Sequence, residues 1–239
     1  MTKNLADVFE RIRQSAKRAG RKSSEIKLVA VSKTHPAETL REAISAGANI
    51  LGENKVQEAE GKITEIGRGA AEWHLIGHLQ SNKARKAVQL FEVIHSVDSL
   101  ELAERLERIC LEEGRENLSV FVHVDLAGEA TKAGIAENDL ASLVEFLKEC
   151  KCLKFDGLMI LPPYSDNTED ARPYFISLRE IRDNLASQNA FSNGTGELSM
   201  GMSHDFEIAI EEGATIVRVG TAIFGERVHR LTRISADKS

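Results

Sequence analysis

The sequence predicts a single (β/α)8 barrel of the TIM type with an extra helix at its N-terminus. Three observations favour this fold class. Eight short apolar runs recur along the chain, segments with helical spacing of apolar residues lie between them, and 239 residues suit one α/β barrel. Strands that alternate with helices form parallel sheets with right-handed crossovers, and eight such units are the number that closes a barrel.

An amphipathic helix comes first, and its apolar face includes Leu5, Val8 and Ile12. We expect it to pack outside the barrel or to cap its floor. The predicted strands lie in KLVAV (27–31), ANILGE (48–53), EWHLIG (72–77), VIHSVD (93–98), SVFVHVDL (119–126), FDGLMIL (155–161), ELSMGMS (197–203) and TIVRVGTAIFG (215–225).

Helical periodicity fills the segments between these strands. The predicted helices cover 40–47, 56–66, 84–88, 102–109, 140–147, 174–185 and about 204–213. We therefore expect a single domain over 1–239, divided into an N-terminal helix (1–26), the barrel (27–225) and a final helix with a tail (226–239). An open doubly wound sheet is the alternative, since periodicity does not reveal closure, but its glycine fingerprint is missing from the sequence.

Composition narrows the possible partners. The formal net charge of −6, with no block of Lys or Arg, disfavours nucleic acid and membrane surfaces. No apolar run has the length of a membrane span and no signal peptide is seen, so we expect a cytoplasmic protein. The three cysteines, Cys110, Cys150 and Cys152, lack metal-ligand spacing and are expected to be buried thiols. His74 and His78 are four residues apart, but His78 lies at a strand end and not on a helix, so no metal site is predicted.

Ser32 and Lys33 lie at the end of the first strand, where the ligand-binding groups of a barrel lie. Partial desolvation there favours the neutral amine, which attacks aldehydes. The alternative is a lysine that reaches out of the barrel mouth to water or pairs with Glu53. Glu53 and Asn54 end the second strand and are expected to line the pocket, although Asn54 would also suit the cap of the next helix.

Two neighbouring loops suggest an anion site. Ser203 precedes a helix start, where a hydroxyl and free backbone N–H groups bind anions. Gly220 allows a ligand to approach the backbone and Thr221 adds a hydroxyl, as in the usual phosphate site of barrels near strands seven and eight. The alternative is a serine that caps the helix and a glycine needed for packing.

Arg218 is a charged residue inside the apolar eighth strand. A buried guanidinium has to be paired, and alternation places Arg218 and Gly220 on the same face. If that face lines the barrel interior, Arg218 points at a ligand. If it is the outer face, Arg218 meets a carboxylate on a helix.

Four stretches occur in order over nearly the whole chain: AVSKTHP (30–36), GENKVQE (52–58), HLIGHLQSNK (74–83) and LSMGMSHDFEIAIEEGATIVRVGTAIFG (198–225). With them the sequence resembles the pyridoxal phosphate homeostasis proteins, which are related in fold to the amino-terminal barrel of alanine racemase. The resemblance implies a Schiff base between pyridoxal 5′-phosphate (PLP) and Lys33. It also implies a phosphate held by Ser203, Gly220 and Thr221, with Arg218 facing the pyridine nitrogen and Asn54 nearby, and it leaves the role of His78 open.

The resemblance further implies a protein of PLP (vitamin B6) homeostasis, with an indirect effect on amino acids and no established catalysis, so no catalytic residue is predicted. The alternative is a PLP-dependent amino-acid racemase or decarboxylase of low activity. Only ERVHRLTRISADKS follows Gly225, so we expect no second domain of the kind that gives racemases a tyrosine base. The expected partners are PLP and PLP-accepting apoenzymes, and the barrel is expected to be a monomer.

Overall fold

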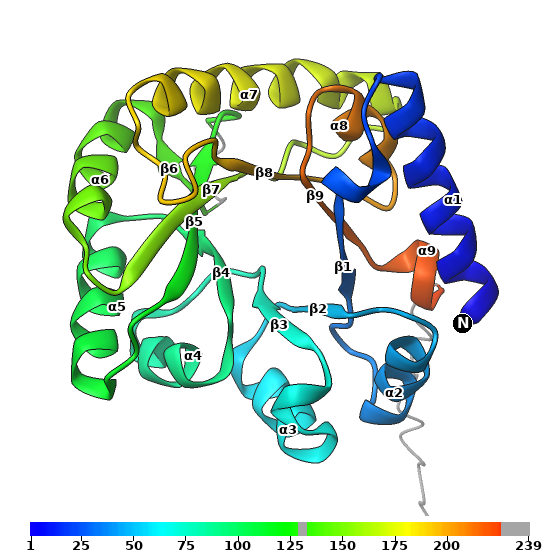
Figure 1. Ribbon diagram of the computed structural model, residues 1–239, viewed down its shortest axis with the longest axis horizontal. Helices are drawn as coiled ribbons and strands as arrows, with labels where there is room; N and C mark the ends of the chain where they lie inside the picture. The colour runs from blue at the N-terminus through cyan, green and yellow to red at the C-terminus, as the bar shows by residue number, and fades with distance from the viewer. Residues whose placement is uncertain (129–132, 226–239) are drawn as a thin grey trace, which may run out of the picture.

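The protein is described here by a computed structural model that covers residues 1–128 and 133–225. Eight parallel strands close into a barrel in the order β1, β2, β3, β4, β5, β7, β8, β9 and back to β1 (Figure 1). Their bounds are β1 Lys27–Val31, β2 Ile50–Glu53, β3 Glu72–Leu75, β4 Val93–Val97, β5 Leu118–Asp125, β7 Leu153–Met159, β8 Glu197–Met202 and β9 Ile216–Val219. The predicted (β/α)8 barrel is confirmed.

Helices surround the barrel in the described ranges. They are α1 Thr2–Arg18, α2 Ala37–Ser45, α3 Val56–Ile66, α4 Ala84–Leu90, α5 Leu100–Glu113, α6 Glu137–Glu149, α7 Arg172–Ser187, α8 Phe206–Glu211 and α9 Thr221–Phe224. The predicted final helix and tail, 226–239, lie outside the described residues. Within the described residues, no helix has the length and apolarity that crossing a membrane requires.

Two short elements differ from the sequence prediction. The two-residue strand β6 (Ile135–Ala136) pairs with β5 beside the barrel; a run this short has no visible period. The apolar run at 215–225 is strand only as far as Val219, because Gly220 leaves the extended conformation and the four-residue helix α9 follows. A third difference is Cys150, which is only half-buried, whereas Cys110 and Cys152 are buried thiols as expected.

Alternation along each strand separates two apolar cores. Residues that face outward form the large core between strands and helices. Residues that face inward fill the barrel, and the buried apolar ones are Val29, Val31, Ile76, Val93, Phe121, Met159 and Ile216. The strands are therefore apolar on successive residues because both of their faces are buried.

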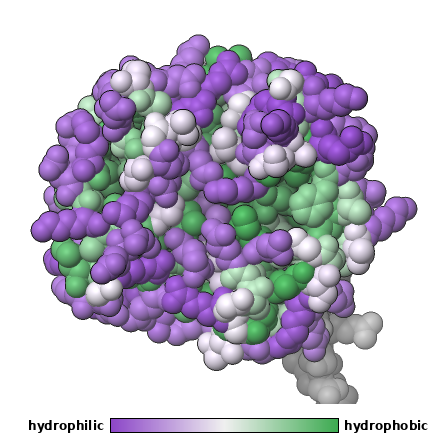
Figure 2. All heavy atoms as spheres, viewed as in Figure 1, coloured by the Kyte–Doolittle hydropathy of each residue, from purple (hydrophilic) through white to green (hydrophobic). Residues whose placement is uncertain are grey.

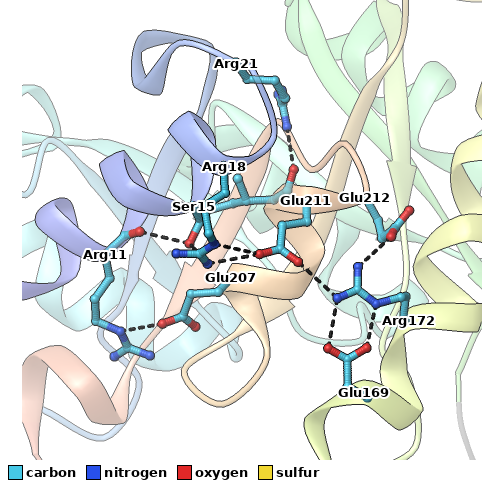
Figure 3. A network of polar contacts seen from close by, with 10 residues as sticks. Arg11, Ser15, Arg18, Arg21, Glu169, Arg172, Glu207, Glu211 and Glu212 are labelled. Atoms are coloured by element: carbon cyan, nitrogen blue, oxygen red, sulfur yellow. Dashed lines mark hydrogen bonds and ion pairs between the residues drawn. The ribbon is translucent and has the colours of Figure 1, made fainter.

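Helix α1 packs outside the barrel against α8 and α9, not across the floor (Figure 1). Its arginines reach the acidic residues of α8: Arg11 contacts Glu207 at 2.6 Å and Arg18 contacts Glu211 at 3.0 Å (Figure 3). Arg172 of α7 meets Glu211 from the other side at 3.0 Å. Helix α8 is thus held between α1 and α7 by charge pairs as well as by its buried face.

The face of the molecule seen down the barrel is mostly hydrophilic, with hydrophobic side chains showing between the polar ones toward its middle (Figure 2). The large hydrophobic residues exposed in the described ranges are Phe9, Leu111 and Tyr164. They belong to α1, to α5 and to the loop after β7, so these three residues come from separate parts of the fold.

Candidate functional site

A cavity of about 590 Å³ opens at the carboxyl ends of the barrel strands. The six binding residues expected from the sequence all line it: Lys33, Asn54, Ser203, Arg218, Gly220 and Thr221. Further lining residues include His78, His123, Asp125, Tyr164 and His204. The fold therefore gathers residues from the ends of β1, β2, β3, β5, β7, β8 and β9 around one space.

Lys33 is half-buried and lies two residues after the end of β1. The backbone on both sides of it is held by charged side chains of α3. Lys62 donates to the Ser32 carbonyl at 2.8 Å, and Glu58 accepts from the Thr34 N–H. Thr34 has a positive φ of 70°, which a β-branched residue rarely adopts without support from its surroundings. These contacts fix the turn that carries Lys33.

Glu53 does not line the cavity, contrary to the sequence expectation. It faces α3, is fully buried, and pairs with Lys62 at 2.7 Å, while the Ser32 hydroxyl donates to the same oxygen at 2.6 Å. Its other oxygen, Oε2, has no hydrogen-bond partner in the described part of the chain. Burial raises the pKa of Glu53, and the charge of Lys62 lowers it only in part.

Sequence reasoning missed Lys62 and Glu58. Their i, i+4 spacing on α3 is visible in the sequence and predicts a helical ion pair, which the structure has at 2.6 Å. The spacing does not reveal that Lys62 is buried beside Glu53, because that burial depends on how α3 packs against β1 and β2.

Asn54 lines the cavity and does not cap α3, whose N-cap is Lys55. The neighbouring strand end approaches its backbone closely. A Cβ at Gly77 would lie 2.4 Å from the Asn54 carbonyl oxygen, so a residue with a side chain would push these two strand ends apart. Gly77 therefore helps to set the width of the cavity at this point.

Ser203 connects the loops after β8 and β9. Its hydroxyl accepts from the Gly220 N–H at 3.1 Å and from the Ala222 N–H at 3.4 Å. It is not the N-cap of α8, because Asp205 holds that position and accepts from the Met202 N–H at 2.6 Å. Hydroxyl and backbone N–H groups thus converge beside Thr221, and such donors suit an anionic oxygen.

Arg218 is 3% exposed and points into the barrel interior and the cavity. Its Nη1 donates to the Ser199 hydroxyl at 2.6 Å and its Nη2 to the Ile160 carbonyl at 2.8 Å. Burial lowers its pKa to about 10, opposed by the charge of Asp205, so the guanidinium stays cationic at neutral pH. Five N–H donors belong to this group, and two of them serve these bonds.

Two histidines line the cavity with different surroundings. His123 is 5% exposed, and burial together with Arg218 lowers its pKa to about 4, so its ring is neutral. His78 is largely exposed, and its Nδ1 lies 2.9 Å from Asp98 Oδ2. Neither was assigned a role from the sequence.

The arrangement combines an amine, a cluster of hydroxyl and N–H donors, and a buried cation. An amine binds an aldehyde covalently, the donor cluster suits a phosphate group, and the guanidinium donates to a ring nitrogen that carries no proton. The set fits PLP, which has these three groups. Within residues 1–128 and 133–225 no group of three His, Cys, Asp or Glu side chains could hold a metal ion.

Known proteins resemble the chain over most of its length. The family model of the alanine racemase N-terminal domain matches residues 4–228. A protein named pyridoxal phosphate homeostasis protein from Aquifex aeolicus (strain VF5) is 44% identical over 223 residues, which cover 93% of this chain and 96% of the relative. The protein of the same name from Escherichia coli (strain K12) is 40% identical and covers 94% of this chain and 95% of its own length.

Solved structures agree with these matches. PipY of Synechococcus elongatus PCC7942, solved with PLP bound, has a TM-score of 0.80 and 41% identity, and the match covers 90% of this chain and 100% of that one. Alanine racemase from Corynebacterium glutamicum has a TM-score of 0.71 at 17% identity, covering 95% of this chain and 62% of the racemase. The second likeness concerns the fold alone.

Proposed function

Because this chain belongs to the alanine racemase N-terminal domain family, with relatives named pyridoxal phosphate homeostasis proteins, we propose that it binds PLP and takes part in PLP homeostasis. The observation that carries the proposal is that Lys33, Ser203 and Arg218 line the same cavity. The structure of PipY with PLP bound supports the cofactor. PLP supplies an electrophilic aldehyde and an electron-withdrawing ring when bound.

We propose the following roles for the lining residues. Lys33 Nζ forms the covalent link to the aldehyde. The Ser203 hydroxyl, the backbone at Gly220 and the Thr221 hydroxyl hold the phosphate. Arg218 donates to the pyridine nitrogen, and Asn54 contacts the cofactor from the end of β2.

Arg218 also limits the chemistry of the ring. A fixed positive charge beside the pyridine nitrogen disfavours its protonation, and an unprotonated ring withdraws electrons less strongly. Carbanion formation next to the ring should therefore be slow. This supports a binding protein over an enzyme.

The covalent site is tested by mapping. Purified protein incubated with PLP should be yellow, and borohydride reduction followed by peptide mass spectrometry should place the adduct on Lys33. Lys33→Ala should lose the covalent absorption band, whereas Lys55→Ala, which changes a lysine outside the cavity lining, should keep it. An adduct on Lys55 or Lys83 would show that the assignment of Lys33 is wrong.

The alternative function is a PLP-dependent racemase or decarboxylase of low activity. The His78–Asp98 pair favours it, since an imidazole held by a carboxylate suits proton transfer. Tyr164 also lines the cavity, but it is 80% exposed and its hydroxyl donates to Asp166 at 3.3 Å. Neither the His78–Asp98 pair nor Tyr164 closes the cavity against water, which a PLP-dependent enzyme would need for fast chemistry.

We expect racemisation of alanine or serine by PLP-saturated protein, followed by chiral chromatography, to stay far below ordinary enzyme rates. Turnover of about 1 per second or more that is lost in both Lys33→Ala and His78→Ala would establish the enzyme instead. Turnover that survives Lys33→Ala would point to a contaminant.

We also propose that PLP-accepting apoenzymes are partners and that the protein is a monomer. Loaded protein mixed with a PLP-free enzyme and a trap for free PLP distinguishes direct transfer from release into solution. Activation of the enzyme despite the trap supports a direct partner. Activation that the trap abolishes means that PLP travels free.

A further inference from the structure

A chain of side-chain hydrogen bonds crosses the barrel interior and ends at Arg218. At its far end, Glu72 Oε1 lies 2.9 Å from His74 Nε2, and His74 Nδ1 lies 2.9 Å from His95 Nε2. His95 Nδ1 then lies 2.8 Å from the Ser199 hydroxyl, which accepts from Arg218 Nη1 at 2.6 Å. The chain passes through β3, β4, β8 and β9.

The far end of the chain reaches a different opening. Glu72 and His74 line a second cavity, of about 300 Å³, together with Lys27, Lys154 and Glu197. None of these residues lines the cavity that holds Lys33. Glu72 is about half-exposed there, whereas His74, His95 and Ser199 are at most 1% exposed.

One placement of the protons gives every bond in the chain a donor and an acceptor. Arg218 can only donate, so Ser199 accepts from it and has its own proton free to donate. Burial, together with the charge of Arg218, holds the pKa of His95 well below its usual range, so His95 is neutral and Nδ1 can accept from Ser199. His95 Nε2–H then donates to His74 Nδ1, and His74 Nε2–H donates to the Glu72 carboxylate.

This direction matters for Arg218 because a serine hydroxyl rotates freely unless a partner fixes it. His95 is the acceptor that turns the Ser199 proton away from Arg218 and leaves a lone pair for Nη1. The His95 ring is itself fixed by stacking on Phe121, with centroids 4.6 Å apart and planes at 7°. Networks of this kind stabilise one arrangement only when every member is satisfied.

We propose that His95, His74 and Glu72 are positioning residues. They hold the Ser199 hydroxyl, and through it the Arg218 guanidinium, in place for a ring nitrogen in the cavity that Lys33 lines (the mouth cavity). None of the three lines that cavity. The inference rests on the proposed binding of PLP. If it holds, residues at the end of the barrel opposite Lys33, such as Glu72, influence how PLP is bound.

The direction of the chain is tested without PLP. Long-range ¹H–¹⁵N spectra of the imidazole nitrogens should show both His74 and His95 as neutral rings with the proton on Nε2. A proton on Nδ1 of His95 at neutral pH would reverse the chain and overturn the proposal.

The coupling is tested with PLP. His95→Phe keeps a ring next to Phe121 but removes both nitrogens, and it should raise the dissociation constant of PLP roughly three- to tenfold and shift the absorption band of the bound cofactor. Glu72→Ala should change both in the same direction by roughly two- to threefold, because water at the open end replaces the carboxylate in part. Glu72→Gln keeps an acceptor and should restore the parent values.

The matched control is Glu197→Ala. Glu197 lines the same far cavity but pairs with Lys27 at 2.8 Å and is not part of the chain, so its removal should leave the band and the affinity unchanged. Because the two chain variants act through one path, His95→Phe combined with Glu72→Ala should be no weaker in PLP affinity than His95→Phe alone. Additive effects, or equal effects of Glu72→Ala and Glu197→Ala, would overturn the proposal.

Thermal unfolding identifies a variant that fails to fold. If His95→Phe does not fold, the PLP affinity of Glu72→Ala and the histidine spectra test the proposal instead, because Glu72 is about half-exposed and its removal leaves the buried core intact. The outcomes also separate the two proposals. If the parent protein binds no PLP, the proposed function fails. If the parent carries PLP on Lys33 and all chain variants match Glu197→Ala, only the positioning role fails.

Discussion

Lys62 has two tasks beside Lys33. Its ammonium group neutralises the fully buried Glu53 and also donates to the carbonyl of Ser32, the residue before Lys33. A buried carboxylate that loses its only cation is costly, whereas a buried pair as a whole contributes little net stability. The buried pair therefore serves placement of the Lys33 turn more than overall stability.

We predict that Lys62→Met lowers the free energy of unfolding by roughly 3–5 kcal/mol, since Glu53 is left buried without a cation. Urea denaturation measures the change. The control is Lys86→Met, which breaks the exposed pair with Glu60 next to the same helix and should cost less than about 1 kcal/mol. The double variant Lys62→Met with Glu53→Gln should recover part of the loss. Equal losses for the two lysines would contradict this account.

Single residues show how far the sequence predicted the site. Alternation on β9 placed Arg218 and Gly220 on one face, and the structure puts Arg218 in the barrel interior, so the alternative of a helix carboxylate is wrong. The sequence could not distinguish a serine cap from a serine that joins two loops, because Ser203 accepts from Gly220, 17 residues away along the chain. The roles of these residues toward PLP stay predictions.

At the scale of elements, the strands and most helices followed from apolar periodicity, because both faces of each strand are buried. Periodicity placed α8 at 204–213, but the helix covers only Phe206–Glu211. Asp205 explains the late start: it is the N-cap, and its carboxylate accepts from Met202. The loop that carries Ser203 is thus longer than predicted.

Arg172 on α7 connects this helix to α8, the helix that follows the loop with Ser203. It pairs with Glu211 of α8 at 3.0 Å, with Glu212, the residue after α8, at 2.7 Å, and with Glu169 at 2.6 Å (Figure 3). These three carboxylates raise its pKa above the usual range. A network of this kind stabilises more than isolated pairs do.

Arg172→Met should lower the free energy of unfolding by roughly 1–2 kcal/mol, because three partly exposed pairs are lost and like charges remain close together. Denaturant midpoints at low and high salt test this, and the loss should shrink at high salt as screening weakens the pairs in the parent protein. Arg13→Met, which removes the exposed pair with Glu10 on α1, should leave the midpoint unchanged. A loss that is independent of salt would assign Arg172 a packing role instead.

At the scale of the whole molecule, acid should unfold the barrel through its buried histidines. The pKa of His123 is about 4 in the folded protein, below the ordinary value near 6.5, so the unfolded chain binds a proton that the folded protein does not. Stability is therefore fully present above about pH 6.5 and falls as the pH drops toward 4, by about 1.4 kcal/mol per pH unit for this residue. His95 acts in the same direction.

His123→Asn should flatten the dependence of stability on pH between about 6.5 and 4, measured by urea denaturation at each pH. His204→Asn, at an exposed position, should leave the dependence as in the parent protein. Glu53 has the opposite effect, because its raised pKa makes stability fall as the pH rises. Since the parent protein and both variants keep Glu53, its contribution cancels when their pH dependences are compared. An unchanged slope in His123→Asn would mean that His123 takes up its proton without unfolding the barrel.

The closed barrel itself was predicted from the number of strand and helix units. The division of the chain at residues 26 and 225, the cytoplasmic location and the monomeric state stay predictions. Periodicity gives the order of elements, but it carries no information about surfaces that meet other molecules.

The filled barrel interior limits how a bound molecule can move. Val29, Phe121 and Ile216 occupy the space between the two ends, so the barrel is not a tunnel, and a molecule in the mouth cavity enters and leaves through the same opening. An acceptor that takes the molecule directly has to cover that opening, and while it does so it prevents reloading. If such an acceptor takes the molecule directly, loading and delivery at this site alternate, and the slower of the two limits the overall rate.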